Sequence, residues 1–407
     1  MADPIASIGR WLEGLLSGLG LAPGVVTVII SILGILAAAT LLLVLDIFLV
    51  WVERKVVARF QDRVGPNRLG PYGLIQPFAD IVKLLIKEDI TPAGADRILY
   101  NIPPIIALAT VILLWSVIPL APTVLGSDIN VGVLFIVAVG AISTLGIIIA
   151  GWASNNKYAL MGAFRTVAQM VSYEIPMVIA LLVPVLLARS MGVGEMVQQQ
   201  TIWYIFLAPI AALLFLISSI AEIGRAPFDL PEAESEIVAG FHIEYTGMKF
   251  GMFYAGELLH ALTVGALFSA FFLGGWRGPF AEQYPILGVF YLFIKAFFMY
   301  WVIMWIKYTF PRIRIDHMLS LCWKFFIPVA LVVLMATAVL DKVMLGLGAS
   351  DTVYALGMIA LNLVLGWGVL LIIRRYAREE RRQAEARRTV FAPLADGPAR
   401  SPVTQTQ

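Results

Sequence analysis

The stretch VVTVIISILGILAAATLLLVLDIFLVW, residues 25–51, carries a single charge, Asp46. About 20 consecutive apolar residues in a helix cross the roughly 30 Å hydrocarbon core of a bilayer, so this stretch predicts a membrane-spanning helix. It is followed by Glu53-Arg54-Lys55 and not by a small-residue cleavage site, which argues against a cleavable signal peptide.

The composition of the whole chain extends this prediction. Of the 407 residues, 60% are hydrophobic and 14% are charged, and the mean hydropathy is +0.88. Soluble proteins have about 45–50% apolar and about 25% charged residues. We therefore predict an all-α, polytopic bundle of about nine transmembrane helices. The predicted spans are 25–51, 102–121, 131–151, 166–187, 202–221, 249–273, 286–306, 325–340 and 353–373.

Lysine and arginine predict the orientation of the bundle, because cytoplasmic loops carry an excess of both. The C-terminal tail and the loops predicted on its side of the membrane hold 24 of the 29 basic residues. The N-terminal segment and the loops on the other side hold four, and Lys295 lies within a span. The N-terminus is therefore predicted outside and the C-terminus in the cytoplasm. We expect one membrane domain, 1–373, with long cytoplasmic loops at 53–100 and 222–248. A basic tail, 374–407, is expected to begin as a helix-like run and to end in disorder.

The content of cysteine and histidine limits redox chemistry. Cys322 is the only cysteine, so the chain alone can hold neither an iron–sulfur cluster nor an internal disulfide. Of the three histidines only His260 lies in a predicted span, whereas a bis-histidine haem needs two on facing helices. We expect Cys322 and His260 to be packing or local hydrogen-bonding residues, and any electron carrier to be mobile or on a partner.

The first long loop contains GPNRLGPYGLIQPFADIVKLLIKED at 65–89. Its glycine–proline pairs are turn signals. Residues 75–86 place apolar side chains on one helical face, which predicts a short amphipathic helix suited to the membrane interface. A solvated connector is the alternative, but long loops are usually functional.

The second long loop contains EIGRAPFDLPEAESEIVAGFHIEYTG at 222–247, in which six acids stand against Arg225 alone. Neighbouring carboxylates raise each other's pKa, which suits groups that take up and release protons near neutral pH. On charge count a solvated acidic face is an equal alternative. The interleaved apolar residues favour a packed, partly buried loop.

Charged residues also occur inside the predicted spans. A charge at the centre of a bilayer costs about 2.5–3.5 kcal/mol on insertion scales. We therefore expect Glu174, Glu257 and Lys295 to face the bundle interior, where they indicate a proton or ion path. Asp46 and Glu53 are seven residues apart and share one helical face. For each residue alone, the alternative is a buried pair that only fixes helix packing.

These loops, with FIKAFFMYWVIMWIKYTFPRIRIDHMLSLCWK at 293–324, resemble the H subunit of bacterial proton-translocating NADH:quinone oxidoreductase, respiratory complex I. The resemblance covers roughly residues 25–345. It implies a multi-pass protein of the bacterial inner membrane that forms a quinone chamber with peripheral-arm subunits and couples quinone reduction to proton translocation. Small and antiporter-like membrane subunits, lipid and the substrate quinone are the other implied partners, and nucleic acid is not. No cofactor is implied in this chain, since flavin and iron–sulfur clusters belong to partner subunits.

The resemblance also implies roles for residues in both loops and in two spans. Two alternatives remain open: the homologous membrane subunit of proton-pumping nickel–iron hydrogenases, which serves no quinone, and a stand-alone ion transporter. The implied proton relay consists of Asp229, Glu232, Glu234, Glu236, Glu244, Glu174 and Glu257. The implied quinone chamber is lined by Arg54, Arg59, Asp62, Arg63, Arg68 and Phe228.

Overall fold

The computed structural model describes residues 4–18, 22–230, 240–348 and 350–390. Within these ranges the chain is all-helical and forms no β-strand, which confirms the predicted fold class. Eight helical segments are long and apolar enough to cross a membrane. The elements are α1 Pro4–Gly18, α2 Pro23–Phe60, η1 Pro71–Gly73, α3 Gln76–Ile86, α4 Arg97–Leu114, α5 Gly132–Ala153, α6 Lys157–Ala188, α7 Val193–Gln199, α8 Tyr204–Leu207, α9 Pro209–Ile223, η2 Gly240–His242, α11 Gly247–Phe272, α12 Pro285–Thr309, α13 Ile315–Leu321, η3 Cys322–Phe326, α14 Ile327–Gly346 and α15 Asp351–Val390.

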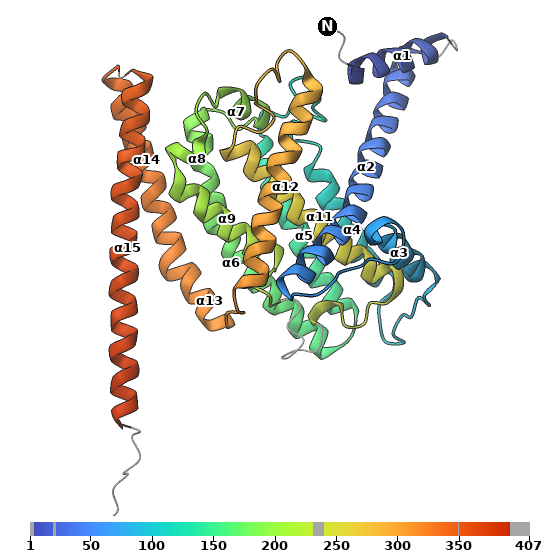
Figure 1. Cartoon of the computed structure of the whole chain (residues 1–407). Helices are drawn as coiled ribbons and strands as arrows, with labels where there is room; N and C mark the ends of the chain where they lie inside the picture. Colours follow the sequence, from blue (N-terminus) through green and yellow to red (C-terminus); the bar gives the residue numbers. More distant parts are fainter. Residues whose placement is uncertain (1–3, 19–21, 231–239, 349, 391–407) are drawn as a thin grey trace, which may run out of the picture.

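The fifth predicted span is not one helix. It is divided into α8 and α9 at Ala208, whose backbone leaves the helical region with φ −140° and ψ 59°. Pro209 follows at the first turn of α9 and has no backbone N–H with which to continue α8. The two pieces still lead together from one end of the bundle towards the other (Figure 1). The prediction of an uninterrupted fifth helix was therefore wrong.

Helix α11 lies at the centre of the bundle, and α2 and α15 lie at its edges (Figure 1). Of the apolar window of α11, 83% is buried inside the protein, against 6% for α2. Large apolar side chains of α2 and α15 are exposed over most of their length. Such surfaces suit a lipid environment, in which the bilayer covers what the protein does not.

The loops that the basic residues group together meet at one end of the bundle, at the bottom of Figure 1. The ammonium of Lys249 lies 2.9 Å from a carboxylate oxygen of Asp89, which joins the first and second long loops. The backbone N–H of Ile313 donates to the carbonyl of Pro227 at 3.0 Å, which joins the second long loop to the α12–α13 connection. These two contacts hold segments of three predicted cytoplasmic loops together.

Proline inside α6 explains how one helical contact is made. Pro176 cannot donate to the carbonyl of Ser172, four residues earlier. The thiol of Cys322 donates to this carbonyl at 3.0 Å, from the π-helical turn η3. In membrane helices freed backbone groups are satisfied by neighbours in this way. Local hydrogen bonding by Cys322 is therefore confirmed.

The predicted interfacial helix is present as α3, and its apolar residues Phe78, Val82 and Leu85 are exposed. Helix α15 continues without interruption through the predicted basic run to Val390. The tail predicted to be disordered, 391–407, lies outside the described residues. Helices α1 and α7 were not predicted.

The basic asymmetry gives a test of orientation. Ser127 is exposed in the α4–α5 connection and Ser350 in the α14–α15 connection, whereas Gln61 is exposed directly after α2. In a Cys322→Ser background, we expect single cysteines at Ser127 and Ser350 to react with a membrane-impermeant maleimide added outside intact cells. A cysteine at Gln61 should react only after the membrane is opened. Labelling of the Gln61 site from outside would reverse the orientation.

Candidate functional site

The guanidinium of Arg225 is the centre of a buried charge cluster. Arg225 follows the end of α9, where Gly224 adopts a left-handed conformation with φ 76° and turns the chain back into the bundle. Only 1% of the Arg225 side chain is exposed. Its Nε donates to Oε1 of Glu257 at 3.1 Å, and a terminal nitrogen lies 3.6 Å from Oε2 of Glu53. A buried charge requires such partners, because it has lost its hydration.

Glu53 extends the cluster to α12. Its Oε1 accepts hydrogen bonds from the ammonium of Lys307 at 2.9 Å and from the hydroxyl of Tyr308 at 2.7 Å. Burial opposes the charge on Arg225, but the carboxylates of Glu53 and Glu257 prevail and hold its pKa above the usual range. We call Glu53, Arg225, Glu257 and Lys307 the Arg225 cluster. It contains two cations and two anions and joins α2, α11 and α12.

Asp46 is a second buried acid of α2, about two helical turns before Glu53. Leu42, Asp46, Leu49 and Glu53 form the buried stripe of the lower half of α2, at helical spacing. The two acids predicted to share one face of this helix are therefore both directed towards the bundle. The carboxylate oxygen Oδ1 of Asp46 has no hydrogen-bond partner among the described residues.

A second group of acids lies on the other side of Glu257. Glu222 and Glu257 both line a partly open cavity of about 100 Å³, together with His242 and His260. The charge of Glu222 also interacts with that of Glu174, half-buried on α6. Of the two predicted membrane glutamates, Glu257 therefore lines the cavity, and Glu174 lies near its other acid, Glu222.

The start of the acidic loop is packed into the bundle. The side-chain amide of Gln169 donates to the carbonyls of Ala221 at 2.6 Å and Phe228 at 2.7 Å. The buried ring of Phe228 lies 5.1 Å from the ring of Tyr173. The predicted packing of this loop is confirmed for its first residues, and Asp229 follows as a partly buried side chain. The predicted relay acids Glu232, Glu234 and Glu236 lie outside the described residues.

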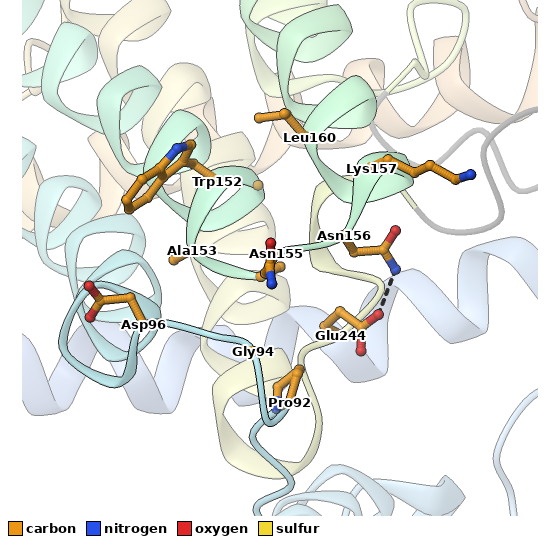
Figure 2. Close-up of a pocket in the computed structure, with 12 residues that line it drawn as sticks. Pro92, Gly94, Asp96, Trp152, Ala153, Asn155, Asn156, Lys157, Leu160 and Glu244 are labelled. Atoms are coloured by element: carbon orange, nitrogen blue, oxygen red, sulfur yellow. Dashed lines mark hydrogen bonds between the residues drawn. The ribbon is translucent and has the colours of Figure 1, made fainter.

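Glu244, the last predicted acid of the loop, lines a separate surface cleft of about 800 Å³ (Figure 2). Its carboxylate accepts a hydrogen bond from the amide of Asn156 at 2.6 Å, drawn as the dashed line in Figure 2. Lys157 and Asp96 lie on the same cleft, at the ends of α6 and α4. Glu244 is therefore not joined to the Arg225 cluster by any described ion pair or hydrogen bond.

The predicted chamber residues of the first loop are mostly on the surface. Arg54 is half-buried and forms an ion pair with Asp80 of α3. Arg63 donates from Nε to the side-chain oxygen of Gln61 at 2.6 Å. Phe228 is buried in the bundle and is not part of this surface. The exposed members are Arg59, Asp62, Arg63 and Arg68.

Lys295 is a membrane charge of a different kind. Its ammonium donates to the backbone carbonyls of Leu273, Gly275 and Arg277 at 2.8–2.9 Å. These carbonyls follow the end of α11, where a cation is favoured by the helix dipole. Lys295 therefore fixes the α11–α12 turn, and no acid among the described residues forms an ion pair with it.

The sequence did not predict the central role of Arg225 or any role for Lys307 and Tyr308. One signal was available, because Arg225 is the only base within a run of six acids. Lys307 and Tyr308 follow a hydrophobic span like many other interfacial residues, so they carry no comparable signal. In the described part of the chain, no group of three or more His, Cys, Asp or Glu side chains is arranged to hold a metal ion.

Residues 31–338 match the family model described as NADH dehydrogenase. The NADH-quinone oxidoreductase H subunit of Dehalococcoides mccartyi is 43% identical over 327 residues, which are 80% of this chain and 90% of the relative. One of the H subunits of Geobacter sulfurreducens, numbered 2, is 46% identical over 305 residues, 72% of this chain and 91% of the relative. This chain belongs to the H-subunit family of NADH-quinone oxidoreductases. The resemblance carried by the two loops is thereby confirmed.

The family match covers the whole Arg225 cluster and both long loops, whereas α15 follows the matched residues. A similar extent is matched by the H subunit of Geobacillus kaustophilus, which is 46% identical over 289 residues, 70% of this chain and 86% of the relative. The residues of the Arg225 cluster therefore lie within the part of the chain that the family model matches, and α15 lies after it.

The burial of Arg225 predicts a large effect on stability. Arg225→Met leaves Glu53 and Glu257 buried without their common partner, which costs about 3–5 kcal/mol. We expect the folded variant in detergent-solubilised membranes to denature at a clearly lower temperature than the wild type. Arg225→Met/Glu257→Gln should recover part of the loss, because it also removes one of the abandoned charges.

Arg54→Met is the matched control. It breaks the ion pair of a half-exposed arginine with Asp80, and such pairs contribute about 0–1 kcal/mol. Equal denaturation temperatures for Arg54→Met and Arg225→Met would contradict the assigned role of the buried guanidinium.

Proposed function

We propose that this chain is the membrane H subunit of a proton-translocating NADH:quinone oxidoreductase in a bacterial inner membrane. In this function it forms part of the quinone chamber with peripheral-arm subunits. It couples quinone reduction to proton translocation through acids inside the membrane. The electrons come from flavin and iron–sulfur clusters of partner subunits. Small and antiporter-like membrane subunits complete the assembly.

The Arg225 cluster carries most of the support for this function. It lies directly behind the start of the acidic loop and reaches three spans, so it joins the loop end of the bundle to the membrane interior. Retaining two carboxylates and two cations inside a membrane bundle is costly for a structure that only needs to pack. Intramembrane ionisable residues are by default associated with ion or proton paths.

The two loops supply the other half of the proposed function. Exposed arginines of the first loop offer planar donors at the loop end of the bundle, where a peripheral arm would dock. The exposed apolar face of α3 suits the membrane interface, from which a hydrophobic quinone would approach. Glu174 and Glu257 would receive the proton signal further inside the bundle.

The arginines of the first loop provide a test of the quinone chamber. Replacing Arg63 or Arg68 by Ala removes a donor fork that only arginine provides. We expect impaired NADH:quinone turnover with the NADH:ferricyanide reaction preserved, because ferricyanide accepts electrons before the quinone. Equal loss of both activities would instead indicate an assembly defect and oppose a direct role of these side chains.

The acidic loop provides a test of coupling. Glu→Gln keeps the size and hydrogen bonding of the side chain but removes its titration. For Glu232→Gln/Glu234→Gln/Glu236→Gln we expect an assembled complex with strongly reduced quinone turnover and a smaller proton gradient in membrane vesicles. Glu282→Gln, at an exposed acid on the opposite end, is the control and should behave as wild type. Wild-type turnover and pumping in the triple variant would leave these carboxylates as a solvated face.

A further inference from the structure

The partly open cavity between α4, α5, α6, α9 and α11 has an apolar lining interrupted by a few titratable side chains, and these are not only carboxylates. Its lining includes Glu222 from α9, Glu257 and His260 from α11, and His242 from η2. The volume is about 100 Å³. This volume has room for a few waters, and the titratable side chains of the lining offer the polar partners that bound water requires.

This cavity separates two groups of charges. On one side, the ion pairs of the Arg225 cluster end at Glu257. On the other side, Glu222 interacts electrostatically with Glu174. No hydrogen bond or ion pair among the described residues joins Glu257 to Glu222. A proton that moves between the two groups must therefore cross the cavity.

The two imidazoles are suited to carry it. His260 follows Glu257 by three residues on α11 and so lies on the same helical face. A neutral imidazole accepts a proton at one nitrogen and donates from the other, which an isolated carboxylate does less readily near neutral pH. Neither imidazole donates or accepts a hydrogen bond with another described protein group, so their nitrogens are available to cavity water. The hydroxyl of Thr166, by contrast, already donates to the carbonyl of Gly162.

We propose that His260, assisted by His242, carries protons across this cavity between Glu257 and Glu222. The proposal rests on the proposed function of the chain and adds the group that bridges its two acidic regions. In one transfer, an imidazole nitrogen of His260 takes a proton from protonated Glu257 through water, and its other nitrogen gives a proton to the Glu222 carboxylate. One proton enters and one leaves, so the imidazole returns to its neutral form in the other tautomer.

The charges around the cavity fit a transient imidazolium. The carboxylates of Glu222 and Glu257 line the same cavity as the two imidazoles, and Arg225 is already paired with Glu257. Glu53 lies behind Arg225 and offsets its charge. At His242, outside the spans, burial lowers the pKa and the charge of Glu257 partly compensates. His242 is therefore neutral at rest, and the two carboxylates of the lining can balance a transient imidazolium in the cavity.

The test uses the whole complex in membrane vesicles. For His260→Asn we expect unchanged assembly and NADH:ferricyanide activity, with NADH:quinone turnover reduced at least about tenfold, as expected for removal of a proton-transfer group. Quinone turnover is also measured from about pH 5.5 to about pH 8.5. The part of the wild-type pH dependence that reflects titration of an imidazole should be absent from the profile of His260→Asn. His317→Asn is the matched control, because His317 is exposed on α13 and remote from the cavity lining; its profile should match wild type.

A second variant separates proton transfer from packing. His260→Ala enlarges the cavity, and added imidazole should restore part of the quinone turnover, whereas pyrazole, of equal size but much weaker basicity, should not. Equal rescue by both compounds would assign His260 a space-filling role and overturn the proposal.

A comparison with Glu257→Gln distinguishes the two levels of inference. Wild-type turnover and pH profile in His260→Asn and in His242→Asn/His260→Asn, with Glu257→Gln inactive, would overturn the histidine bridge and leave the proposed function intact. Wild-type behaviour of Glu257→Gln would overturn the proposed function itself.

Discussion

The buried guanidinium of Arg225 is the constraint on which the functional end of the bundle depends. A charge that is 1% exposed must be neutralised by neighbours, since the free energy of leaving it unpaired exceeds the stability of most domains. Its partners come from α2 and α11, and Lys307 of α12 then balances the second carboxylate. The positions of three spans and of the loop after α9 are thereby coupled, although α2 has few other buried side chains.

The helical class of the chain follows from its sequence because a bilayer imposes a simple rule. Every backbone polar group must be satisfied within the segment, so a long apolar run is a helix. The same rule does not reveal where a helix is interrupted. The break at Ala208 depends on Pro209, yet Pro103, Pro104 and Pro176 occur inside continuous helices. Whether a proline interrupts a membrane helix is decided by neighbours that satisfy the freed carbonyl, as Cys322 does for Ser172.

The sequence was enough to predict the acids of the candidate site but not the cations that pair with them. Glu53, Glu174 and Glu257 are recognisable because a carboxylate is unexpected in or beside an apolar run. Which cation each one meets is a matter of helix packing between positions far apart in the chain: Glu53 contacts Lys307, 254 residues later. Lys295 shows that a charge within a span need not belong to the site. It is as unexpected in its span as the glutamates, yet three backbone carbonyls account for its charge.

This difference in partners separates charges that can transmit a signal from charges that cannot. Carbonyls have fixed positions and never titrate, so the ammonium of Lys295 has one stable arrangement. In the Arg225 cluster the guanidinium is shared by carboxylates of α2 and α11, Glu53 is also bonded to Lys307 of α12, and two cations balance two anions. Protonation of either carboxylate leaves the cluster with an uncompensated cation in a medium of low dielectric constant, where an excess charge acts strongly on its neighbours. A change of protonation at one end is therefore felt at Glu257, which faces the cavity that leads to Glu222. Such a response requires the cluster to be neutral at rest, and its composition meets that requirement.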